Sequence, residues 1–178
     1  TETKFFVSNE KINNAKKFFD KDLYNIVIGA GSSGPDTRWG EKNYIDLINR
    51  LNEIGNYFFY IQCGPEQNEI SKNIISNVNK KNCMNLSNMN IKQIIPILYL
   101  CDMYVGNDSF SHHITTQCNK PSIVLLLNSP KAYSDYSANH HRIIPDNVKI
   151  DDIDHTSKFD ASLISVEKVY NKIINLKN

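Results

Sequence analysis

The sequence predicts an α/β fold in which a doubly wound parallel sheet carries helices on both faces. Three observations lead to this expectation. Short runs rich in β-branched and aromatic residues alternate with longer amphipathic stretches. The short runs are apolar throughout, as expected for strands that are covered on both faces. The connections are only a few residues long, which favours right-handed crossovers between parallel strands. The 178 residues fit one domain.

Six strands are expected, each from a short apolar run that ends at glycine, proline or polar residues. They cover residues 24–28, 57–61, 83–86, 103–105, 122–127 and 142–144.

Helices are expected between these strands and at both ends of the chain. Ser8 has the residue type of an N-cap for an opening amphipathic helix, and Pro96 predicts either a kink or a delayed start in the fourth helix. Asp108 or Ser109 is expected to cap the fifth helix. The expected helices cover residues 8–19, 41–54, 66–78, 90–98, 109–118 and 166–176.

Composition excludes several classes of function. Twenty basic and 19 acidic residues give a formal net charge of +1, which argues against binding to nucleic acid or to an anionic membrane surface. No apolar stretch approaches the ~18 residues that span a bilayer. The start of the chain lacks the apolar core of a signal peptide, so a cytoplasmic protein is expected.

The cysteines give no sign of a zinc site or of a disulfide framework, because they occur singly and without a C-x-x-C pair. They are Cys63, Cys83, Cys101 and Cys118. The His140-His141 pair has no carboxylate at metal-ligand spacing, so no metal site is expected there.

Three polar loops follow three of the expected strands. They contain residues 29–39, residues 64–66 and residues 106–113. Because the carboxyl ends of parallel strands lie at one edge of a sheet, these loops are expected to converge there, at the edge where doubly wound sheets bind their ligands.

The first loop has the composition of a phosphate site. Glycines and the hydroxyls of Ser32 and Ser33 allow a phosphate to approach the backbone, and Arg38 can neutralise its charge. The alternative is that Arg38 points to solvent. Trp39 is expected to pack in the core rather than to take part in chemistry.

In the second loop, Glu66 is a candidate acceptor for the hydroxyls of a ribose. The alternative is that Glu66 only places a favourable negative charge in the first turn of the next helix.

The third loop leads from a strand into a helix, so backbone amides at the helix start can bind phosphate or pyrophosphate. Asp108 either caps this helix only, or also orders the loop and accepts from sugar hydroxyls. Of the adjacent His112 and His113, only one can face the cleft. His113 is expected to be a donor to phosphate or sugar, and the alternative is a buried packing histidine.

These motifs resemble those of the family 9 glycosyltransferases, the ADP-heptose:lipopolysaccharide heptosyltransferase family. Residues 108–121 resemble the family signature D-S-G-P-x-H-x-A-A-x-x-G-x-P, residues 29–39 resemble P-G-A-S-x-x-K-x-W-P, and residues 64–66 resemble G-G-P-x-E. Two departures from the family affect positions expected to lie near phosphate. Phe110 replaces a glycine, and Thr37 replaces a lysine, with Arg38 beside it.

The resemblance implies a Rossmann-like domain, the C-terminal half of a GT-B glycosyltransferase. Residues 1–178 would then be one nucleotide-sugar-binding domain. Within it, residues 1–20 would be an entry helix from an N-terminal domain, 21–145 the core, and 146–178 a tail with a closing helix. The family's catalytic carboxylate and acceptor site belong to the N-terminal domain, so no catalytic residue is expected in this chain.

The resemblance also implies the ligands. A nucleoside-diphosphate sugar, ADP-heptose in this family, would supply the sugar, and a lipopolysaccharide-type or other glycan acceptor at the inner face of the membrane would receive it. No cofactor is implied. The expected donor-binding residues are Ser32, Ser33, Arg38, Glu66, Asp108, Ser109 and His113.

Two other interpretations remain open at this stage. One is a non-catalytic nucleotide-binding or glycan-binding module of the same fold. The other is an enzyme related to the sugar-nucleotide epimerases.

Overall fold

A computed structural model describes residues 5–178, and these residues form one six-stranded sheet in which every neighbouring pair of strands is parallel. The strand order is β3-β2-β1-β4-β5-β6. The strands are β1 (Tyr24–Gly29), β2 (Tyr57–Gln62), β3 (Cys83–Asn85), β4 (Met103–Asn107), β5 (Ser122–Leu125) and β6 (His140–Ile143).

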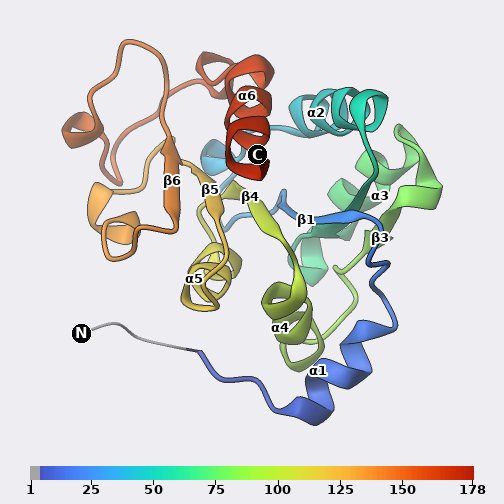
Figure 1. Ribbon diagram of the computed structural model, residues 1–178. Coiled ribbons are helices and arrows are strands. Elements are labelled where there is room, and N and C mark those ends of the chain that lie inside the picture. Colours follow the sequence, from blue (N-terminus) through green and yellow to red (C-terminus); the bar gives the residue numbers. More distant parts are fainter. Residues whose placement is uncertain (1–4) are drawn as a thin grey trace.

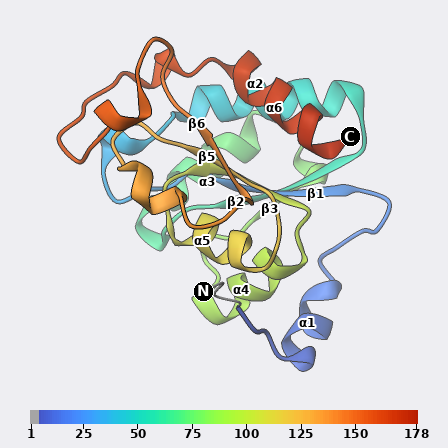
Figure 2. The same cartoon turned by 60° about the vertical axis from the view of Figure 1, so that its left-hand side comes forward.

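Helices cover both faces of this sheet, which confirms the doubly wound prediction (Figures 1 and 2). They are α1 (Asn9–Lys16), α2 (Glu41–Ile54), α3 (Asn68–Ser76), α4 (Ile91–Leu100), α5 (Phe110–Gln117) and α6 (Val166–Lys177). Helices α2, α3 and α6 pack on one face, and α4 and α5 pack on the other, with α1 against α4. No helix in the described part of the chain is long and apolar enough to cross a membrane.

The last three strands each differ from the expected boundaries by two residues at one end, and β4 ends at Asn107 rather than at residue 105. β5 ends at Leu125 rather than at residue 127, and β6 begins at His140 rather than at residue 142. His140 is polar, but it pairs in register with Ser122 of β5, so the backbone ladder sets the start of this strand. Of the expected entry segment, residues 1–4 lie outside the described residues, and α1 covers only residues 9–16.

Two helix starts agree with the sequence signals. The Ser8 hydroxyl accepts from the Lys11 amide and caps α1. Asn90 and Gln93 form a reciprocal capping box at the start of α4. Pro96 lies inside α4, which starts directly after this box, so the proline does not delay the helix.

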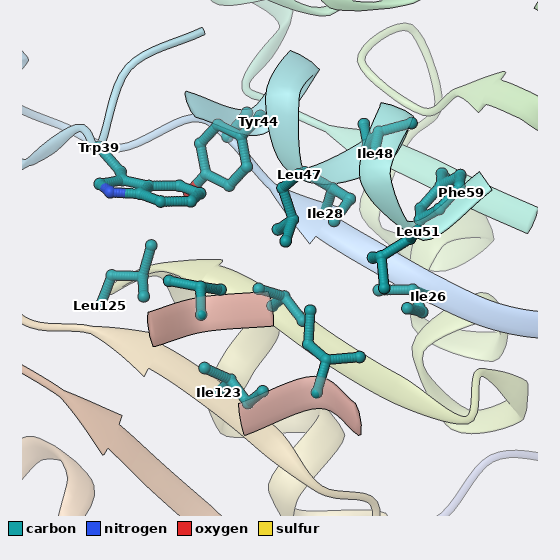
Figure 3. Packing of buried hydrophobic residues seen from close by; sticks show 14 of the residues in the cluster. Ile26, Ile28, Trp39, Tyr44, Leu47, Ile48, Leu51, Phe59, Ile123 and Leu125 are labelled. Carbon is teal, nitrogen blue, oxygen red and sulfur yellow. The ribbon is translucent and has the colours of Figure 1, made fainter. Parts of the chain in front are cut away.

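The larger core lies under α2 and α6, where Trp39 and Tyr44 meet edge to face with ring centroids 4.9 Å apart (Figure 3). Both side chains are buried, which confirms the packing role expected for Trp39. Leu47 and Leu51 of α2 lie fully buried over Ile26 and Ile28 of β1. Burial of each such side chain contributes about 1.5–3 kcal/mol.

Strands β1 and β4 approach closely where both end. Gly29 pairs with Gly106, and a methyl group added to Gly106 would lie 2.5–2.7 Å from backbone atoms of Gly29. Glycine is therefore required here by the space between the strands. The loops that follow the two strands leave the sheet side by side from this point.

Candidate functional site

The strand order reverses direction between β1 and β4. From β1 the chain moves outward to β2 and β3, then crosses back to β4 and continues to β5 and β6 on the other side. Doubly wound sheets bind ligands at the carboxyl edge of this switch point. The three loops selected from the sequence follow β1, β2 and β4, so all three lie at this edge.

Asn107, the last residue of β4, ties the β1 loop to this edge. Its side chain is fully buried, and its Oδ1 accepts from the Trp39 amide and from the Tyr44 hydroxyl, both at 3.0 Å. Its Nδ2 donates to the Ala30 carbonyl at 2.9 Å. Asn107 lies just after the expected strand 103–105, and nothing in the sequence pattern indicated this role.

The β1 and β2 loops meet at the carbonyl of Ser32. Gln67 donates to this carbonyl from Nε2 at 2.6 Å, and the Arg38 guanidinium donates to it at 3.3 Å. A methyl group on Gly31 would lie 2.5 Å from Gln67 Oε1, so the small residue allows this approach. The predicted convergence of the loops is confirmed.

The hydroxyls of the β1 loop differ in environment. Ser32 is buried, and its Oγ donates to the Gly34 carbonyl at 2.8 Å and contacts the Thr37 hydroxyl. Thr37 donates to the same carbonyl at 2.7 Å. Both hydroxyls therefore hold the shape of the loop, whereas Ser33 is exposed.

Arg38 is the positive charge of this loop. Its Nε is buried and has no hydrogen-bond partner among residues 5–178, and its guanidinium forms no ion pair with a carboxylate in that range. The side chain borders a cavity of about 470 Å³. Lys158 also borders this cavity, as do Asp36 and Asp160, so its two basic residues are matched by two acidic ones.

The start of α5 has no side-chain cap. Ser109 occupies the N-cap position, but its hydroxyl lies 3.1 Å from the Tyr104 hydroxyl instead of bonding to an α5 amide. The Asp108 carboxylate accepts from His112 at 2.5 Å. Ser109 is therefore the N-cap residue, as expected, but the side-chain capping bond does not form, because both side chains are engaged elsewhere. The first-turn amides of α5 are left for a ligand.

Phe110, which stands where the resembling family has glycine, is the first residue of α5. Its φ is not positive, so the position does not need the conformational freedom of glycine. The phenyl ring is 38% exposed.

Asp108 and the two histidines form one electrostatic group. Burial raises the pKa of Asp108, but hydrogen bonds from His112 and Ser129, with the charges of His112 and His113, outweigh it and lower this pKa overall. Burial, with repulsion from His112, lowers the pKa of His113 to about 4 against the attraction of Asp108. His113 is therefore a neutral imidazole near pH 7.

Only one of the two adjacent histidines is accessible, as expected. His112 is fully buried, whereas the His113 side chain is 33% exposed and its Nδ1 bonds to the Tyr136 hydroxyl. The position of Tyr136 could not be found from the sequence, because it lies in a loop without periodicity.

Glu66 is the predicted residue that the structure does not bring to the others. It lies exposed in a short 3-10 turn, Pro65–Gln67, before α3. Its carboxylate makes no hydrogen bond or ion pair within residues 5–178. The neighbouring Gln67 is the residue of this turn that reaches the β1 loop.

The fold and this edge together define an α/β protein of the doubly wound class, with basic and amide groups gathered at its switch point. Comparison with known proteins makes the assignment specific. The chain belongs to glycosyltransferase family 9 (heptosyltransferase), whose model matches residues 1–160. The family resemblance inferred from the motifs is thereby confirmed.

Three relatives illustrate the similarity. Lipopolysaccharide heptosyltransferase 1 from Campylobacter coli is 24% identical over 83% of this chain and 44% of its own length. The E. coli ADP-heptose lipopolysaccharide heptosyltransferase II has a similar structure, with a TM-score of 0.79 and 22% identity over 97% of this chain and 53% of its own. The structure of E. coli heptosyltransferase WaaC with ADP-2-deoxy-2-fluoro heptose is also similar, with a TM-score of 0.70 and 16% identity. The match covers 94% of this chain and 48% of that one.

The chain therefore spans about half the length of the relatives it matches. The structural similarity confirms the fold as one half of the GT-B arrangement.

Proposed function

We propose that this chain is the donor-binding half of a glycosyltransferase. Its donor is a nucleoside-diphosphate sugar, with ADP-heptose the expected compound, and the sugar passes to a lipopolysaccharide-type or other glycan acceptor. Membership of family 9 supports this proposal, as does the E. coli relative whose structure holds an ADP-heptose analogue.

The observation that carries the proposal is the uncapped start of α5, which directly follows β4, whose last residue Asn107 bonds to the Arg38 loop. The diphosphate is negatively charged, and it takes hydrogen bonds from the first amides of α5 and charge from Arg38. These groups stabilise the negative charge that develops on the diphosphate as the bond to the sugar breaks.

The other predicted residues take supporting positions around the donor. Ser33 and Ser109 offer hydroxyls at the edge of the loop and of the helix, while Ser32 shapes the loop through its bond to Gly34. Glu66 is exposed and accepts from the ribose. His113 is neutral, so it can lie beside the phosphate or sugar without adding charge.

The rest of the reaction belongs to an N-terminal domain that carries the acceptor site and the catalytic carboxylate. The acceptor hydroxyl attacks the anomeric carbon with inversion, loses its proton to that carboxylate, and displaces the nucleoside diphosphate. The acceptor is a lipid-linked or other glycan at the cytoplasmic face of the membrane. This chain alone is expected to bind donor without transferring it.

Calorimetric titration with ADP, UDP and GDP, each with and without Mg²⁺, tests the proposal. We expect saturable binding of one nucleotide, with ADP preferred and no requirement for Mg²⁺. Arg38→Ala should weaken binding by about 10–100-fold, the range expected for loss of a charge-assisted hydrogen bond. Arg50→Ala is the matched control, because Arg50 pairs with Glu167 on the α2–α6 side.

Wild-type affinity in both Arg38→Ala and Asp108→Ala, with both variants folded, would rule out this site. The second candidate function is a non-catalytic binding module, because Thr37 replaces the lysine that the family has at this position. A full-length protein that binds ADP but transfers no sugar to any glycan acceptor would support that module instead.

A further inference from the structure

Three histidines meet beside Asp108, although they come from two distant parts of the chain. His112 and His113 lie in α5, and His140 begins β6. One ring nitrogen from each lies within 4.8 Å of one from each of the other two. The ring centroid of His112 lies 3.7 Å from that of His113 and 5.2 Å from that of His140.

In two of these rings, one nitrogen lies within hydrogen-bonding distance of a side-chain oxygen, and the other nitrogen has no hydrogen-bond partner in the described chain. His112 Nε2 lies 2.5 Å from Asp108 Oδ1, while its Nδ1 is buried without a hydrogen-bond partner in the described chain. His140 Nδ1 lies 3.3 Å from the Thr116 hydroxyl, while its Nε2 is likewise buried and unpartnered. Both side chains are more than nine-tenths buried.

The third ring repeats the pattern at the solvent side. His113 Nδ1 bonds to the Tyr136 hydroxyl, and its Nε2 is 3.8 Å from Asp108 Oδ1, beyond hydrogen-bonding distance. Because His113 is partly exposed, an ion can enter from this side, and one coordination position remains open to water.

A packing role alone leaves this arrangement unexplained. A buried histidine that only fills space normally has both nitrogens paired, because an unpaired polar atom loses its hydration without compensation. A metal ion supplies the missing partner. A carboxylate that holds the far nitrogen of a ligating histidine is a usual second-shell feature of metal sites, and Asp108 holds His112 in this way.

We propose that His112, His113 and His140 bind a divalent transition-metal ion, with Asp108 and Thr116 orienting two of the rings. Imidazole ligands suit zinc, copper, iron and nickel. Nitrogens about 2.0–2.1 Å from a tetrahedral zinc stand roughly 3.3 Å apart, and one nitrogen from each of the three rings lies within 4.8 Å of the other two here. This site does not depend on the proposed donor specificity.

The protonation state of the rings agrees with this geometry. Burial, with repulsion from neighbouring histidines, lowers the pKa of His113 and of His140 to about 4. Both rings are therefore neutral near pH 7, and a metal ion binds them without displacing a proton.

Titration of the metal-free full chain with Co²⁺, followed by visible absorption, tests the site. We expect saturation at one equivalent with the strong d–d bands of a tetrahedral site, and displacement of Co²⁺ by Zn²⁺. His140→Ala and His113→Ala should each weaken binding at least about 100-fold, and Thr116→Val, which loses only an orienting hydroxyl, by about 10-fold. His141→Ala is the control, because His141 adjoins His140 in β6 but lies outside the cluster.

Absence of saturable binding to the wild type would overturn the site, as would unchanged binding in both His113→Ala and His140→Ala. His113 is partly exposed and Thr116→Val conserves volume, so these variants should fold, which far-ultraviolet circular dichroism checks. Arg38→Ala separates the two proposals, because it should lower nucleotide affinity and leave one equivalent of Co²⁺ bound.

Discussion

Two buried polar centres adjoin the end of β4, and they differ in whether their hydrogen bonds are complete. The Asn107 centre joins the amide of Asn107 to Trp39, Tyr44 and Ala30, and both side-chain atoms have partners. The histidine centre, formed by His112, His113 and His140, leaves two buried ring nitrogens without a partner among residues 5–178. The first centre is complete in the protein alone, whereas the second is complete only with a ligand.

The difference in completeness matches a difference in position. Asn107 lies under the loops and fixes the edge on which a donor would bind, so its role is to hold the scaffold. The histidine centre lies beside the uncapped start of α5 and reaches solvent through His113. We therefore expect the Asn107 centre to contribute mainly to stability, and the histidine centre to make stability depend on pH and to bind a ligand.

The largest effect is expected when the complete centre is broken. Asn107→Ala leaves the Trp39 amide, the Tyr44 hydroxyl and the Ala30 carbonyl without their buried partner. We expect a loss of about 3–4 kcal/mol in the free energy of unfolding, since each unsatisfied buried group costs about 1–3 kcal/mol. Urea unfolding followed by circular dichroism measures this loss.

Asn49→Ala is the matched control for this variant. Asn49 is an exposed asparagine of α2 whose bond to the Asn77 carbonyl is long, at 3.5 Å. Its replacement should change stability by no more than about 0.5 kcal/mol. Equal losses in the two variants would show that the buried network around Asn107 adds nothing.

The histidine centre should make stability depend on pH. The pKa of His113 and of His140 is about 4 in the folded chain, against an ordinary value of 6.5. The unfolded chain therefore binds protons first as pH falls, and stability is lost between about pH 6.5 and pH 4. Because His113 is partly exposed, its contribution is discounted, and we expect a loss of roughly 3 kcal/mol across this window, most of it from buried His140.

Urea unfolding at a series of pH values in the presence of a chelator measures this dependence. Facing the two rings are His112, Asp108, Arg142 and His141. In His140→Ala the fall in stability from pH 6.5 to pH 4 should be clearly smaller, while His155→Ala, which changes an exposed histidine, should follow the wild type. An identical slope in all three proteins would contradict the role given to this centre.

The sequence predicted most of the fold because its signals are local. Apolar runs and the turns after them marked all six strands, and the edge that carries the loops followed from their parallel order. Ser109 was placed correctly at the helix N-cap, but its capping bond does not form, because the hydroxyl of Tyr104 in β4 lies within hydrogen-bonding distance of the Ser109 hydroxyl. The N-cap preference of serine does not include this strand-to-helix contact.

The two polar centres were not predictable for a related reason. Asn107 has the sequence context of an ordinary strand end, and its three partners become neighbours only when β1, α2 and β4 assemble. His140 joins the α5 histidines only because β6 begins two residues earlier than the apolar pattern indicates. Pairing across the sheet, and not sequence spacing, creates the histidine centre.

The smallest effect is expected from loss of one hydrogen bond next to the Asn107 centre, the bond from the Trp39 indole to Ile164. Trp39 donates from its indole nitrogen to the Ile164 carbonyl at 2.7 Å and so holds the segment before α6 against the β1 loop. Trp39→Phe keeps an aromatic ring against Tyr44 but leaves this buried carbonyl unpaired, so we expect a loss of about 1–2 kcal/mol. Trp39→Leu, which also removes the aromatic contact, should cost more stability.

Because Trp39 is the only tryptophan, circular dichroism must replace fluorescence as the probe of unfolding. Equal losses in the two variants would assign the stabilisation to the indole bond alone, and no loss in Trp39→Phe would assign it to packing.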